Sequence, residues 1–125
     1  MKKVLLSLIT VSIVALAGCT KEEEHNHVTI TFDEPTEGEI IALADAADVH
    51  VHIEFAYEVE GEEVEIKLHP EGDETDLIIN HDAHSHDNPI VFMQNVDLSS
   101  YPAGTEFHLE AKACENHECT ESVTE

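Results

Sequence analysis

The segment with the clearest capacity for chemistry spans residues 80–88, where three histidines and two aspartates fall within seven residues. In an extended chain His84 and His86 point to the same side, and a turn before them could bring His81 round to join them. Three imidazole nitrogens with a carboxylate or a water meet the tetrahedral coordination that zinc prefers. The pattern predicts a metal site formed by His81, His84 and His86, with Asp82 and Asp87 as further ligands or as hydrogen-bond partners of the histidines.

The expected metal is Zn or Cu, because imidazole ligands suit these ions and hard cations such as calcium prefer oxygen. The alternative is a solvated polar loop whose histidines make only ordinary turn hydrogen bonds. A set of ligands drawn from one loop does not by itself separate the two interpretations. A third, weaker hypothesis is calcium binding by the acidic stretch 73–76.

His50 and His52 form a second candidate pair, because they alternate with apolar residues and so lie on the polar face of one predicted strand, beside Glu54. Two histidines at this spacing can chelate an ion across a strand face. The alternative is that they are simply soluble residues of the strand.

Cys114 and Cys119 are separated by four residues that suit a hairpin turn. Such a turn would place the two cysteines opposite each other across adjacent strands, near the separation that a disulfide requires. A disulfide is expected outside the cytoplasm. The alternative is a thiolate–imidazole metal site made of Cys114, His117 and Cys119.

The charge of the chain restricts its partners. The 125 residues carry 28 Asp and Glu against five Lys and no Arg, a formal net charge of −23. Such a surface repels nucleic acid, whose binding depends on Lys and Arg, and attracts cations and basic surfaces. The sequence contains no G-x-S-x-G elbow, no Gly-rich phosphate loop and no H-E-x-x-H motif. We therefore expect a protein that is not an enzyme.

The N-terminus has the layout of a secretion signal: Lys2 and Lys3 precede an apolar run that is too short for a comfortable transmembrane helix. The run ends in Leu16-Ala17-Gly18-Cys19, which resembles the lipobox of bacterial lipoproteins. The resemblance implies that residues 1–18 are removed, that Cys19 is acylated, and that the chain is anchored by its lipid in the cell envelope, at the periplasmic or surface face of the outer membrane. Residues 19–27 then form an acidic tether. Its run 21–24 resembles the export signal of some surface lipoproteins, although a solvated spacer needs the same composition.

From Val28 onward apolar residues recur with a period of two, which indicates strands and not helices. Predicted strands cover 28–32, 49–55, 64–68, 77–79, 90–93, 107–113 and 121–124, with a polar loop over 80–89. About seven short strands separated by turn residues favour an all-β antiparallel sandwich over residues 28–125.

The stretch from Val96 to Ala113, with Asp97-Leu98-Ser99 and Gly104-Thr105 before an alternating strand, resembles bacterial immunoglobulin-like and fibronectin-III-like domains. The resemblance implies an immunoglobulin-like β-sandwich. The chain lacks the inter-sheet cysteine pair and the core Trp of antibody domains, so the resemblance implies a fold and not a function.

Together these features predict a membrane-anchored, non-catalytic lipoprotein that binds Zn or Cu for scavenging, buffering or delivery of the metal. The rival hypothesis is an interaction module that docks on an envelope protein complex or a cationic partner without metal.

Overall fold

The computed structural model describes residues 26–120 and 122–125. The predicted signal peptide, the predicted acylation site Cys19 and the predicted tether up to residue 25 lie outside the described residues. The described chain contains no helix, and so no helix long and apolar enough to cross a membrane.

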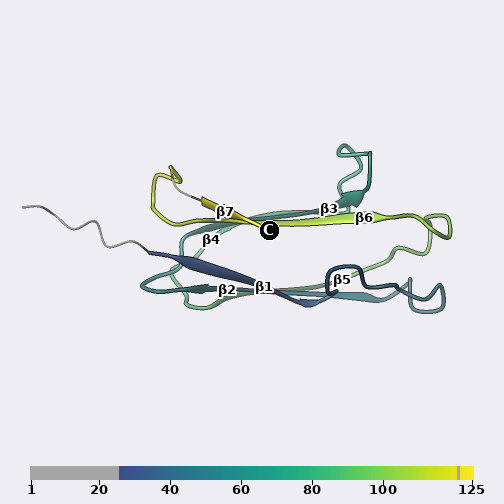
Figure 1. The fold of residues 1–125 in the computed structure, drawn as a ribbon, viewed down its shortest axis with the longest axis horizontal. Coiled ribbons are helices and arrows are strands. Elements are labelled where there is room, and N and C mark those ends of the chain that lie inside the picture. Colours follow the sequence, from purple (N-terminus) through teal and green to yellow (C-terminus); the bar gives the residue numbers. More distant parts are fainter. Residues whose placement is uncertain (1–25, 121) are drawn as a thin grey trace, which may run out of the picture.

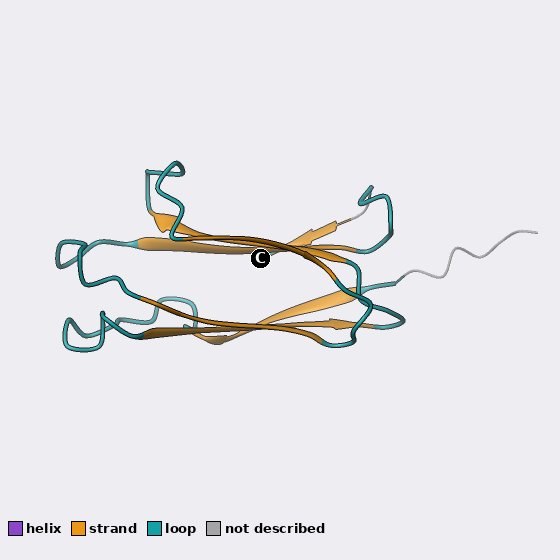
Figure 2. Ribbon diagram, turned by 180° about the vertical axis from the view of Figure 1, so that it is seen from behind, coloured by secondary structure: helices purple, strands orange, loops and turns teal. Residues whose placement is uncertain are grey.

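Seven strands form two antiparallel sheets that face each other as two layers (Figure 1; Figure 2). One sheet has the order β1-β2-β5 and the other has the order β4-β3-β6-β7. The strands are β1 (Val28–Glu34), β2 (Val49–Tyr57), β3 (Glu63–Pro70), β4 (Ile79–His84), β5 (Ile90–Val96), β6 (Phe107–Cys114) and β7 (Ser122–Thr124). The predicted all-β sandwich of seven strands is confirmed.

The core lies between the sheets and follows from the alternation of the sequence. In β2 every second residue from Val49 to Tyr57 is buried, while His50, His52 and Glu54 face outward. Val64, Ile66 and Leu68 of β3 do the same from the opposite sheet. The largest fully buried side chains are those of Phe55, Ile53, Ile66, Ile79, Val51 and Val64. Burial of this apolar surface is the main force that holds the layers together.

The position of β4 decides where its histidines lie. In constant-type immunoglobulin domains the fourth strand joins the first, second and fifth, whereas here β4 pairs with β3. The register places His84 opposite Glu63, at the end of the four-stranded sheet where the β2–β3 and β6–β7 connections also lie. This end of the sandwich carries the candidate metal centre.

One predicted element was wrong, and two apolar side chains lie outside the core. Residues 80–84 were predicted to be part of a loop. They belong to β4 instead, because they form a regular ladder with β3. No strand forms around Ile40, and this side chain is almost fully exposed. Met93 is 63% exposed, because Ile90 and Phe92 take the inward positions of β5.

Candidate metal centre

Three segments that are distant in the sequence bring Glu62, His84 and His117 together. One carboxylate oxygen and one ring nitrogen from each histidine all lie within 4.8 Å of one another. Glu62 immediately precedes β3, His84 ends β4, and His117 lies in the hairpin between β6 and β7. Because β3 is the neighbour of both β4 and β6, the strand order places these three residues at the same end of the four-stranded sheet.

His86 extends the group to three imidazoles. Its Nε2 lies 3.4 Å from the Nε2 of His84, and its ring centroid is 5.7 Å from that of His117. Two nitrogen ligands that are each about 2.0–2.1 Å from a tetrahedral zinc ion lie about 3.3 Å apart. The His84 and His86 nitrogens therefore already have the separation that one shared zinc ion imposes. His84 and His117 are exposed, so rotation of their side chains can close the remaining distances.

Two carboxylates complete the cluster. The Oε1 of Glu60 lies 2.6 Å from the Nδ1 of His86, and the Oε2 of Glu62 lies 2.8 Å from the Nδ1 of His117. Glu60 is exposed and can orient His86 through its second nitrogen, as carboxylates commonly do for metal-bound histidines. Glu62 differs because it is 8% exposed, the one charged residue in the core of the described chain.

A cation beside Glu62 would stabilise the buried carboxylate. Its Oε2 has no hydrogen bond of good alignment among the described residues, although His117 is within contact distance. Of the two lysines in the described chain, Lys67 contacts Glu65 and Lys112 lies opposite Glu65 in the β3–β6 ladder. A buried carboxylate without a partner costs several kcal/mol. A bound metal ion, or a protonated His117, would offset that cost.

Close packing of two loops fixes the position of Glu62. Gly61 lies directly against the backbone carbonyls of Ser85 and Asp87, leaving no room for a Cβ atom. The Ser85 N–H donates to the Glu62 carbonyl, at 3.3 Å. Asn88 binds both the N–H and the carbonyl of Tyr57, at 2.9 and 2.6 Å, and so ties the 85–89 segment to the end of β2.

The hairpin that carries His117 is closed covalently. Cys114 and Cys119 form a disulfide, as predicted, with their Cα atoms 4.9 Å apart. Inside the closed loop, Asn116 accepts from the Thr120 N–H and donates to its hydroxyl. The alternative thiolate site fails because both sulfurs are used in the bond, but its third member, His117, does belong to the cluster.

The hydroxyl of Tyr57 lies near Glu62. Burial, together with the charges of Glu62 and Glu115, raises the pKa of Tyr57 to about 12. The Glu62 N–H points towards the hydroxyl and opposes this shift, yet the contact lacks the geometry of a full hydrogen bond, so the oxygen has no good partner in the described chain. Tyr57 is therefore neutral at any physiological pH.

Of the residues predicted from the sequence, the structure brings His84 and His86 together and separates them from His81. Strand residues three apart face opposite sides of a sheet, so His81 points inward, with its ring centroid 5.0 Å from that of Phe92. Asp82 faces outward opposite Glu65. Asp87 instead accepts a hydrogen bond from the Ser85 hydroxyl, at 3.0 Å. None of these three belongs to the group formed by the described residues.

The pair His50 and His52 shares the outer face of β2, as predicted, with ring centroids 6.2 Å apart. Each ring has another partner: His50 lies 2.7 Å from Asn95 Oδ1, and His52 lies 3.5 Å from Asp33 Oδ2. No third ligand joins them within the described part of the chain. In the acidic stretch 73–76, two carboxylates already accept hydrogen bonds from other side chains of the protein. Asp73 accepts from Thr75, and Asp76 accepts from the Tyr101 hydroxyl.

Comparison with known proteins gives no relative: no protein-family model, no curated protein and no solved structure matches the chain. The function must therefore be argued from the geometry of the cluster.

Proposed function

We propose that the protein is a lipid-anchored envelope protein that binds one Zn or Cu ion through His84, His86, His117 and Glu62, and that it serves to scavenge, buffer or deliver the metal. The observation that carries this proposal is the 3.4 Å separation of the His84 and His86 nitrogens, beside the buried carboxylate of Glu62, whose Oε2 lies 2.8 Å from the Nδ1 of His117. The ligand types are those of zinc and copper sites.

A non-catalytic role fits the number of ligands. Catalytic zinc sites keep one coordination position open for water or substrate, whereas structural and storage sites are closed by four protein ligands. Three imidazoles and the Glu62 carboxylate supply four ligands. Binding of the ion would also neutralise Glu62, the one buried carboxylate of the described residues, so metal uptake would stabilise the fold.

The place of the cluster suits exchange of metal close to a membrane. Asn26 accepts from the N–H groups of Val59 and Glu60 and donates to the Glu60 carbonyl, so the chain enters the fold beside the cluster. If Cys19 carries a lipid, six residues lie between it and Asn26, and the seven Cα–Cα steps span at most roughly 25 Å. The ion would then lie within reach of membrane proteins that could supply or accept it.

Equilibrium dialysis of the purified protein against Zn²⁺ or Cu²⁺, followed by metal analysis, tests the proposal. We expect about one ion per chain. We also expect a gain in the free energy of unfolding of about 2.7 kcal/mol when the free metal exceeds the dissociation constant a hundredfold. Uptake of several weakly held ions, with no change in stability, would contradict the proposal.

A further inference from the structure

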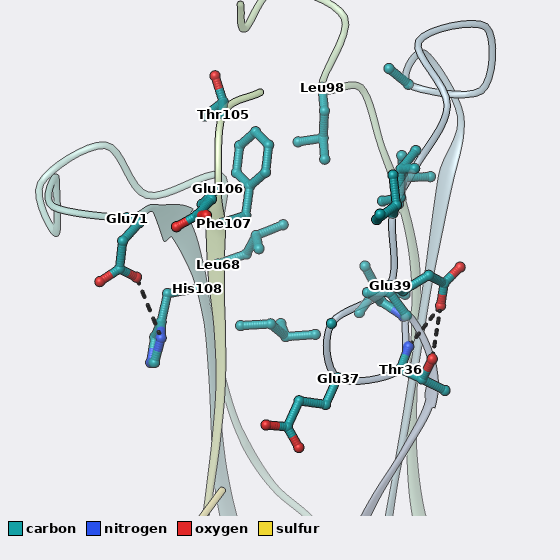
Figure 3. A pocket seen from close by; sticks show the side chains of 18 of the residues that line it. Thr36, Glu37, Glu39, Leu68, Glu71, Leu98, Thr105, Glu106, Phe107 and His108 are labelled. Atoms are coloured by element: carbon teal, nitrogen blue, oxygen red, sulfur yellow. Dashed lines mark hydrogen bonds and ion pairs between the residues drawn. The ribbon is translucent and has the colours of Figure 1, made fainter. Parts of the chain in front are cut away.

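A second feature lies between the edges of β1 and β6, away from the metal cluster. A cavity of about 1090 Å³ opens there and is lined by apolar side chains of both sheets. Figure 3 shows Leu68, Leu98 and Phe107 directed into this space. Ile30, Phe32 and Leu109 also belong to its apolar lining. A volume of this size holds several side chains or a ligand.

Among the described residues, the edge of β6 that borders the cavity has no strand partner along half of its length. β7 pairs with Lys112–Cys114, and Glu125 extends the ladder by exchanging two hydrogen bonds with Ala111. Figure 1 shows β6 continuing well beyond the end of β7. Alternate residues of an antiparallel strand point their N–H and C=O to the same side. Within the described chain, Leu109 and Phe107 therefore offer unpaired backbone groups at this edge.

The rim of the cavity is acidic. Glu37 and Glu39 lie on the connection that follows β1, and Glu71 and Glu106 lie on the opposite side (Figure 3). Neither of the two lysines in the described part of the chain lines the cavity. His108 is held beside Glu71, with 3.9 Å between Nδ1 and Oε2. An occupant must therefore combine apolar groups for the interior with positive charge for the rim.

We propose that this groove binds an extended segment of a partner protein, in which apolar residues alternate with lysine or arginine, and that the segment adds to β6 as a further strand. Hydrogen bonds to Phe107 and Leu109 would hold its backbone. Side chains opposite these two residues would fill the cavity. The alternate side chains would lie opposite His108 and Glu110, on the outer face, near Glu71.

A strand accounts for more of the site than a small amphiphilic cation would. Both occupants satisfy the cavity and the acidic rim, but only a strand satisfies the unpaired edge. Exposed edges of this kind are the usual templates for strand addition. The proposal does not depend on metal binding, so the two are tested separately.

The probe is a fluorescent peptide that alternates valine and lysine, titrated by anisotropy into the purified full-length chain in buffer that contains a metal chelator. Two further peptides carry N-methyl groups on alternate residues, one along each edge of the strand. Only the edge that faces β6 needs its N–H groups. We therefore expect one methylated peptide to bind at least about tenfold more weakly and the other to bind like the parent.

A second measurement needs no variant. Hydrogen exchange of the Phe107 and Leu109 amides should slow when the unmodified peptide is added, because these groups become paired. Two variants add a third test: Glu71→Gln together with Glu110→Gln should weaken binding, because these carboxylates lie where the lysine side chains would, whereas Glu54→Gln on the outer face of β2 should not. The proposal would be overturned if both methylated peptides lost affinity equally, or if a scrambled peptide of the same composition bound as well as the parent peptide. It would also be overturned if dodecylamine displaced the peptide and the peptide had not slowed exchange of the Phe107 and Leu109 amides.

Discussion

Gly61 lies so close to the backbone carbonyl of Ser85 that a Cβ atom at position 61 would fall well inside van der Waals contact. The contact locks the β2–β3 connection against the segment that follows β4. Glu62 follows Gly61 in the sequence and His86 follows Ser85, so the contact between Gly61 and Ser85 sets the distance between the Glu62 carboxylate and the His86 imidazole. The geometry of the candidate metal cluster thus depends on Gly61, which has no side chain to act as a ligand.

Replacement of Gly61 tests this dependence. Gly61→Ala should lower the free energy of unfolding by about 1–3 kcal/mol, as overpacking commonly does, and should weaken zinc binding because the two loops must separate. Gly38→Ala is the matched control: its φ of 73° strains an alanine, but the space around it is open and it lies outside the cluster. That variant should lose about 1 kcal/mol of stability and keep its zinc affinity. Equal zinc affinity in both variants would show that the lock is irrelevant to the site.

The disulfide should contribute to stability and to metal binding together. Replacing both Cys114 and Cys119 with serine should lower the free energy of unfolding by about 2 kcal/mol, from the chain entropy of a short loop. Zinc affinity should fall as well, because His117 sits within the loop that the bond closes. Chemical denaturation and zinc titration measure the two effects. Two thiols that react with alkylating reagents in the native protein, at Cys114 and Cys119, would refute the bond itself.

The buried hydroxyl of Tyr57 gives a prediction at alkaline pH. Because its pKa is raised to about 12 in the folded chain and is about 10 in an unfolded one, the unfolded state loses its proton first. The free energy of unfolding should therefore fall as the pH rises from about 10 to about 12, and Tyr57→Phe should reduce that fall. Near neutral pH the variant should be as stable as the parent or up to about 1 kcal/mol more stable, because it removes a polar atom without a good partner. A loss above 1 kcal/mol at neutral pH would mean that the hydroxyl does have one.

The lipid anchor is tested at Cys19. If the lipobox is used, Cys19→Ala should abolish acylation, and the protein should leave the detergent phase. Intact mass and phase partitioning measure this directly. A variant that still partitions with the lipid phase would rule out Cys19 as the attachment point.

The sequence predicted the sandwich because its inner strands alternate strictly. In 49–55 and 107–113 every second residue is apolar, and both segments became strands as expected. The sequence did not predict β4 beyond Ile79, because the inward positions that follow are taken by His81 and Ala83, which are only weakly hydrophobic. Hydrogen bonds to β3 extend the strand there, and no local sequence pattern predicts these hydrogen bonds.

The candidate site could be predicted only in part for a related reason. His84 and His86 are adjacent enough to be recognised from spacing alone. Glu62 and His117 join them through the order β4-β3-β6-β7, which the sequence does not state. His117 was named only through its place between two cysteines, and nothing in the local sequence marked Glu62 apart from the glycine before it.

The most direct test of the metal centre is calorimetric titration of zinc into the parent, His117→Ala and His81→Ala. The account predicts about one zinc ion per parent chain, at least about tenfold weaker binding in His117→Ala, and near-parent affinity in His81→Ala, with His50→Ala as a control on an exposed strand face. Because protons compete with a metal for imidazole, the parent's affinity should also fall as the pH is lowered from about 7.5 to about 5.5. If His117→Ala titrates like the parent while His81→Ala loses the site, the cluster is wrong and the ligands lie in the 81–87 segment alone.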